Sequence, residues 1–173
     1  YCTDMLDLMI LYLLIKRDLT MYAIHKHIKE NFGSYTNPSF GAVKPALVRL
    51  EKNGCITSAK LMSEGGKLSI FYSITGNGMK ELKNLLQKPL SKNPIQFMSD
   101  ARIKLSCLSV LDKPEIQTVC ENIKEIALFH KLNAEKNLSD EYISLTPYQK
   151  IVLDNAICEY KNFVSMVEGL EKS

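Results

Sequence analysis

The stretch PSFGAVKPALVRLE, residues 38–51, decides the fold that we expect for this chain. It predicts a helix from about Phe40 to Asn53, with Ser39 as its N-cap. Pro45 fits this helix if the helix starts close to Gly41, because a proline in the first turn lacks only an N–H that would have no partner there. The stretch therefore predicts a helix with a polar entry and an apolar inner face.

Two more helices are expected upstream of this one. Thr3-Asp4 begins a helix that continues to Arg17 and is apolar nearly all round, which is typical of a helix buried on most faces. Asp18-Leu19 predicts a turn, and Thr20 is placed to cap a second helix over residues 21–32. Three short helices are thus expected in the first 53 residues.

A hairpin and a further helix are expected downstream. ITSAKLM and LSIFYSI, residues 56–62 and 68–74, are rich in β-branched and aromatic side chains and flank the glycine pair of SEGGK. Thr75 then opens a helix that ends before Pro89. The order helix, helix, helix, hairpin, helix is that of a winged helix-turn-helix domain, whose third helix enters the major groove of DNA.

The charges of the chain are distributed in agreement with this reading. Residues 1–90 hold 12 Lys and Arg against 7 Asp and Glu, whereas residues 91–173 hold 10 against 12. A DNA-binding half needs a cationic surplus to neutralise phosphates, although a chance excess of a few charges is the alternative.

The second half of the chain predicts a helical domain. Residues 89–94, PLSKNP, have the composition of a linker, and helical periodicity follows over 95–105, 114–138 and 147–171. Two long amphipathic helices cannot bury wide apolar stripes alone, so a partner chain is expected. The fold expected is mainly α with a small β-hairpin wing: a winged domain over 1–88, the linker, and a helical dimerisation domain over 95–173.

Catalytic and metal chemistry are not indicated. The five cysteines are scattered and form no C-x-x-C motif, which favours reduced thiols in a cytoplasm over a disulfide framework, with a redox sensor as the alternative. His25 and His27 are two residues apart on one helix and point in different directions. No acid completes a triad with Cys120 and His130. We expect no enzyme, no metal and no cofactor.

Membrane insertion and secretion are not expected either. The apolar run from Leu6 to Ile15 is about ten residues long, well short of the roughly 20 that span a bilayer. Asp4 and Asp7 lie where a signal peptide would carry basic residues. The expected location is the cytoplasm.

Several motifs, in order and at characteristic spacing over roughly residues 8–86, resemble the PadR family of transcriptional regulators. They are residues 38–51 with Asn53-Gly54, then Ile10–Leu14, Tyr22, Gly65-Gly66 to Tyr72, and Ile74-Thr75 with Gly78. The resemblance implies a repressor that binds a pseudo-palindromic operator in double-stranded DNA as a homodimer. It also implies dimer contacts through the C-terminal helices, with the first helix as a further contributor, and release from DNA by a small aromatic compound or another signal.

The chain departs from the family pattern at three places. The family commonly has Thr or Ser at Ala42, Tyr at Lys44, and a His-Gly pair at Thr20-Met21. At the expected DNA face a hydroxyl and a phenol are lost and an ammonium is gained. This exchange suggests that phosphate contact replaces some neutral hydrogen bonding and that the operator differs.

The residues expected to contact DNA lie in the loop before the third helix, on that helix and on the wing. They are Tyr35, Asn37, Ser39, Gly41, Ala42, Lys44, Pro45, Arg49, Lys60 and Lys67. Lys44 is a groove-facing contact or a solvated lysine, and Arg49 binds phosphate, reads a base or pairs with Glu51.

Two other functions remain open at this point. One is a protein–protein interaction module with a winged domain that does not bind DNA specifically. The other is a sensor that binds hydrophobic small molecules between the first and last helices.

Overall fold

The computed structural model describes residues 3–62, 66 and 68–172. The chain forms two compact units: residues 1–88 with 98–110, and residues 89–97 with 111–173. The division falls inside α5 (Pro94–Ser106), so the first unit takes in a segment that we expected in the second. The role of the second unit in dimerisation stays a prediction.

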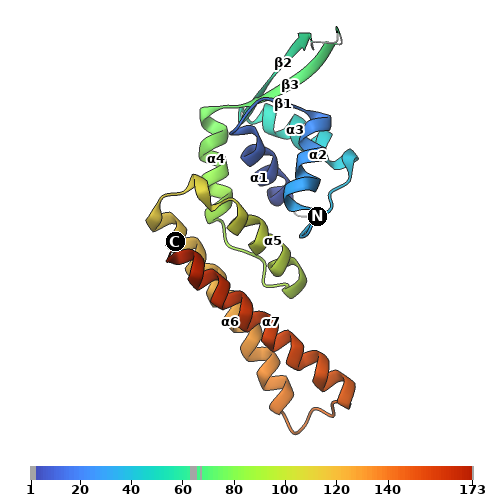
Figure 1. The fold of residues 1–173 in the computed structure, drawn as a ribbon, viewed down its shortest axis with the longest axis vertical. Coiled ribbons are helices and arrows are strands. Elements are labelled where there is room, and N and C mark those ends of the chain that lie inside the picture. Colours follow the sequence, from blue (N-terminus) through green and yellow to red (C-terminus); the bar gives the residue numbers. More distant parts are fainter. Residues whose placement is uncertain (1–2, 63–65, 67, 173) are drawn as a thin grey trace. The chain divides into compact units, whose positions relative to one another are not determined.

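The first unit is built around α1 (Thr3–Leu14), against which α2 (Met21–Phe32), α3 (Phe40–Lys52) and α4 (Gly76–Gln87) pack (Figure 1). Leu8, Met9, Ile10 and Leu11 of α1 are fully buried, as the apolar sequence of this helix predicts. The helix stops before Arg17, because the Ile15 amide donates to Tyr12 in a tighter turn.

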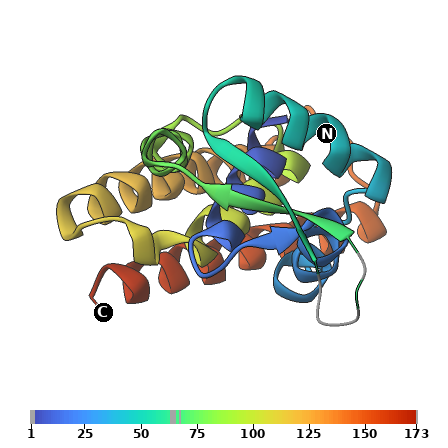
Figure 2. The ribbon, with the colours of Figure 1, turned by 90° about the horizontal axis from the view of Figure 1, so that it is seen from above.

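The wing forms as predicted and gains one strand. β2 (Ile56–Met62) and β3 (Leu68–Ile74) pair antiparallel and have the bounds read from the sequence. The expected turn at Asp18-Leu19 is wrong for Leu19, since β1 (Leu19–Thr20) pairs with β3 and makes a sheet of order β1-β3-β2 (Figure 2). A strand of two residues has no periodicity of its own, so only its partner reveals it.

The start of α3 differs from the expectation in one respect. Because the helix begins at Phe40, Pro45 is its sixth residue and lies in the second turn, not the first. The ring therefore removes a hydrogen bond that an amide would make to Gly41. Ser39 is the N-cap residue, but its side chain makes no capping bond, unlike Thr20, which accepts from the Ala23 amide at 3.3 Å.

The second unit is a pair of long helices, α6 (Lys113–Ser139) and α7 (Pro147–Glu171) (Figure 1). Both begin with a capping box, Asp112 with Glu115 and Thr146 with Gln149, and both have proline in the first turn. The buried residues of these two helices are Val119, Cys120, Ile123, Ala127, Ala134, Ile157, Phe163 and Val167. A short 3-10 turn, η1 (Leu108–Val110), follows α5 in the first unit.

The thiols that the structure describes are mostly buried. Cys55, Cys107 and Cys120 are buried and Cys158 is exposed. Burial raises the pKa of Cys107 to about 12, which keeps this thiol protonated and unreactive. Cys2 lies outside the described residues.

No helix in the described part of the chain has an apolar stretch long enough to cross a membrane. Within residues 3–62, 66 and 68–172 no group of His, Cys, Asp and Glu is arranged to hold a metal ion.

Two glycines in the first turn of α4 give a matched test of this fold. A Cβ on Gly78 would lie 2.1 Å from the backbone oxygen of Cys55, whereas a Cβ on Gly76 would meet nothing within 4 Å. Gly78→Ala is expected to lower the free energy of unfolding by about 2 kcal/mol or more, because backbone must move to relieve the clash. Gly76→Ala is expected to be neutral or slightly stabilising. Urea unfolding of both variants measures the difference, and equal effects would contradict the packing of α4 on Cys55.

Candidate nucleic-acid interface

The outer face of α3 carries a narrow exposed stripe. Gly41, Lys44, Pro45 and Val48 are all exposed and occupy positions i, i+3, i+4 and i+7, which lie on one face of a helix. The opposite face buries Val43, Ala46, Leu47 and Leu50 in the core of the unit. Three predicted site residues, Gly41, Lys44 and Pro45, therefore lie together on one surface.

Arg49 does not belong to this stripe. Its Nε donates to Asp7 Oδ2 at 3.0 Å and its Nη2 donates to Asp7 Oδ1, so the guanidinium holds both oxygens of one carboxylate on α1. Only 13% of the Asp7 side chain is exposed. Burial raises the pKa of the Asp7 carboxyl, and Arg49 offsets part of that rise. The structure thus gives Arg49 a structural partner in place of DNA or Glu51, and Glu51 accepts from the Ser58 hydroxyl.

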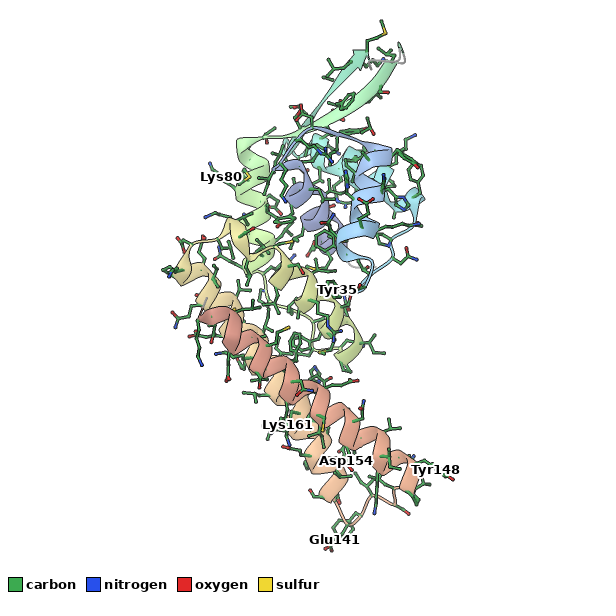
Figure 3. All side chains as sticks on the ribbon, viewed as in Figure 1. Tyr35, Lys80, Glu141, Tyr148, Asp154 and Lys161 are labelled. Atoms are coloured by element: carbon green, nitrogen blue, oxygen red, sulfur yellow. The ribbon has the colours of Figure 1, made fainter. Side chains whose placement is uncertain are left out.

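The loop before α3 has a mixed character. Tyr35 is 37% exposed, and its carbonyl accepts a hydrogen bond from Ser99 at 2.8 Å (Figure 3). Asn37 and Ser39 are exposed, whereas Ala42 is half-buried on the flank of α3. The polar side chains of this loop therefore reach solvent beside the exposed stripe, and Ala42 contributes less surface.

The wing brings further side chains to the same side of the first unit. Tyr72 is opposite Ser58 and Ile70 is opposite Lys60, so these four share one face of the hairpin. Lys60 is exposed, and Lys67 lies outside the described residues. The tip is also apolar, with Leu61, Met62 and Leu68 exposed.

Sequence reasoning missed two exposed side chains near these groups. Val48 is 59% exposed on α3, and Tyr22 is 71% exposed in the first turn of α2. Helical spacing from Gly41 and Lys44 could have found Val48. Tyr22 is an apolar residue of an amphipathic helix, and only its position in the first turn, two residues after the N-cap Thr20, indicates that it is exposed.

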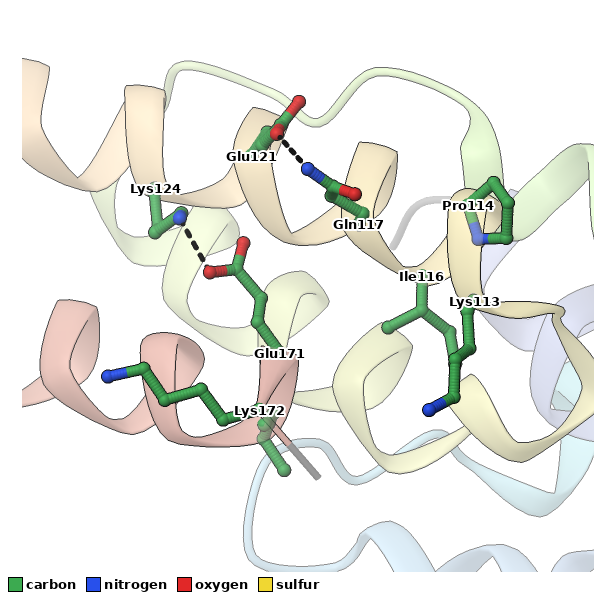
Figure 4. A pocket seen from close by; sticks show the side chains of 9 residues that line it. Lys113, Pro114, Ile116, Gln117, Glu121, Lys124, Glu171 and Lys172 are labelled. Carbon is green, nitrogen blue, oxygen red and sulfur yellow. Dashed lines mark hydrogen bonds and ion pairs between the residues drawn. The ribbon is translucent and has the colours of Figure 1, made fainter.

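Two of the cavities lined by described residues lie in the second unit. Figure 4 shows one of about 630 Å³, lined by the start of α6 and the end of α7, in which Lys124 Nζ lies 2.7 Å from Glu171 Oε2. The Glu171 hydrogen bond raises the pKa of Lys124, and the other Glu171 oxygen is buried without a hydrogen-bond partner. The other cavity, about 470 Å³, is mainly apolar and includes Ile143, Tyr148 and Val152.

Part of the chain is similar to a known protein family. Residues 10–84 match the model of the family described as "Transcriptional regulator PadR-like family". No curated protein matches the chain. Among solved structures, Bacillus subtilis PadR in complex with operator DNA is 23% identical, with 96% of this chain and 97% of that chain covered and a TM-score of 0.47.

Two other solved structures have similar identities, coverages and TM-scores. Bacillus subtilis PadR in complex with p-coumaric acid is 24% identical, with 99% and 96% of the two chains covered and a TM-score of 0.44. A Streptococcus mutans protein is 23% identical, with 96% and 98% covered and a TM-score of 0.46. These structures are reported for their similarity alone, and the family match concerns residues 10–84.

The Asp7–Arg49 pair gives a test of the structural role of Arg49. Arg49→Met is expected to lower the free energy of unfolding by about 2 kcal/mol at pH 7, because it leaves a mostly buried carboxylate without its partner. A carboxyl whose pKa is higher in the folded than in the unfolded state favours folding as the pH falls. The difference in the free energy of unfolding between the wild type and Arg49→Met should therefore be smaller at pH 5 than at pH 7, because Asp7 takes up a proton.

The control for this measurement is the double variant Asp7→Asn, Arg49→Met. It has no carboxylate to protonate, so its stability relative to the wild type should depend less on pH. If Arg49→Met were as stable as the wild-type protein at pH 7, Arg49 would be free to contact DNA.

Proposed function

Because residues 10–84 match the model of the PadR-like family of transcriptional regulators, we propose that the chain belongs to this family and acts in the cytoplasm as a homodimeric repressor of a pseudo-palindromic operator. The observation that carries the proposal is the exposed stripe of α3, which includes Lys44, a residue with no side-chain partner among the described residues. A helix with such a stripe fits the major groove, where base edges are read.

The contacts that we propose divide into two kinds. Gly41, Pro45 and Val48 are small or apolar and suit close approach to base edges, including the methyl group of thymine. Lys44, Lys60 and the exposed groups of the preceding loop suit phosphate oxygens. Arg49 is left out of this interface because Asp7 holds it.

The proposed dimer uses the second unit. Apolar side chains of both long helices are exposed there, which a single pair of helices cannot cover. They are Leu128, Phe129 and Leu132 of α6 and Tyr148, Ile151 and Val152 of α7. A second copy with the same stripe supplies a self-complementary cover, and the resulting two-fold axis matches a palindromic operator.

Release by a small-molecule effector remains a prediction, since neither cavity of the second unit points to one ligand. The interaction-module alternative predicts no specific affinity for DNA, so the same binding measurement decides between it and the proposal.

Binding to the upstream intergenic DNA of the chain's own gene tests the proposal. The wild-type protein should bind that duplex at least about 1,000-fold more tightly than an unrelated duplex, with an affinity that falls steeply between 50 and 200 mM salt. Val48→Asp should weaken specific binding by about tenfold or more, because it places a carboxylate on the DNA-facing stripe. Asn84→Asp, which adds the same charge to an exposed site on α4, serves as the control. Equal, sequence-independent affinity for all duplexes would favour the interaction module.

Sedimentation equilibrium tests the dimer. Ile151, 66% exposed on α7, is expected at the interface, so Ile151→Lys should raise the dissociation constant of the dimer by about tenfold or more. Asp154→Asn makes the same change in net charge on α7 and should leave the dimer intact (Figure 3). A wild-type protein that sediments as a monomer at micromolar concentration would contradict the proposal.

A further inference from the structure

A pocket in the first unit joins α2, α3 and the wing. Its volume is about 400 Å³, and it lies where the N-terminal turn of α2 meets α3 and β3. Its lining residues are Thr20, Met21, Tyr22, Lys44, Ser69, Ile70 and Tyr72. Three elements that are far apart in sequence thus bring one ammonium and two phenols to one hollow.

The polar groups of this pocket are not used by the fold. Lys44, Tyr22 and Tyr72 have no hydrogen-bond or ion-pair partner within the described part of the chain. Burial raises the pKa of the Tyr72 phenol, and the Glu51 carboxylate raises it further, so the hydroxyl stays protonated at neutral pH and can donate. The pocket therefore offers a cation and two hydroxyl donors to a ligand.

The backbone around the pocket adds to this preference. Thr20 is the N-cap of α2, a helix of 12 residues, and the N-terminus of a helix carries partial positive charge. None of the described residues that line the pocket is acidic. Such surroundings favour an anion, while Met21 and Ile70 give the hollow apolar walls that suit the sugar of a nucleotide.

We infer that this pocket binds one backbone phosphate of the operator duplex, with Lys44 as the cation and the Tyr22 and Tyr72 hydroxyls as donors. The inference rests on the proposed function and deepens it. It assigns Lys44 to the phosphate backbone and not to a base edge, since a lysine held between α2 and β3 stands at the side of α3 that faces the wing. Base reading is then left to Gly41, Pro45 and Val48.

The two roles of Lys44 differ in a measurable way. A phosphate contact contributes equally to every duplex, and losing it reduces the slope of log affinity against log salt by about 0.9. A base contact contributes only to the operator, and its loss relaxes specificity.

The experiment measures the affinity of each variant for the upstream duplex and for an unrelated duplex at several salt concentrations. Lys44→Ala should weaken binding to both by the same factor, about tenfold, and reduce the salt slope by about 0.9. Tyr22→Phe and Tyr72→Phe should each weaken binding to both duplexes about fivefold or more, because each removes one hydrogen bond to a charged group. The salt slope should change little in these two variants. The matched controls are Lys80→Ala on α4 (Figure 3) and Tyr142→Phe, at a residue that is 99% exposed.

Circular dichroism and urea unfolding check that each variant is folded. Loss of affinity for the upstream duplex alone in Lys44→Ala would overturn the inference in favour of a base contact. Unchanged affinity in Lys44→Ala, or in both tyrosine variants, would also overturn it. If the wild-type protein bound neither duplex, the proposed function itself would fail. If the wild-type protein bound the upstream duplex and the variants bound it equally well, only the inference about the pocket would fail.

Discussion

The pair between Asp7 and Arg49 is the interaction on which the position of α3 depends. Asp7 lies on a helix that is buried on nearly every side, so its carboxylate needs a partner that satisfies both oxygens. Arg49 supplies two donors in one planar group, and it does so from the inner flank of α3. Because this pair fixes the rotation of α3 against α1, the stripe from Gly41 to Val48 faces solvent.

This constraint also shapes the chemistry available for recognition. The only arginine of α3 is engaged in holding the helix, and the outward stripe has one lysine among small and apolar side chains. Bidentate reading of guanine, the commonest specific contact, is therefore absent from this stripe. If the stripe reads DNA as proposed, close packing against base edges and anchoring of the backbone from the pocket beside the wing would supply most of the discrimination, and the shape of the operator would matter as much as its hydrogen-bonding pattern.

Local patterns in the sequence predict most of the fold, and contacts between distant residues account for what they miss. The wing strands have the expected bounds because turn glycines and β-branched residues act locally, and Thr20 caps α2 as expected. By contrast β1 exists only through its pairing with β3, and Arg49 and Asp7 are 42 residues apart. The pocket at Lys44 combines three separate elements, so spacing could identify the lysine but not the two tyrosines beside it.

The second unit shows why a helical pair of this kind requires a partner. Ala127 and Ala134 are buried between α6 and α7, and such small side chains let the two helices approach closely. Each helix has only one neighbour in the pair, however, and that neighbour cannot cover the whole width of the apolar stripe. Leu132, Ile151 and Val152 therefore stay exposed. In the proposed dimer, a second copy related by a two-fold axis would cover both stripes at once and would present two copies of the proposed DNA-reading helix. The symmetry that would bury this apolar surface is therefore the symmetry of a palindromic operator.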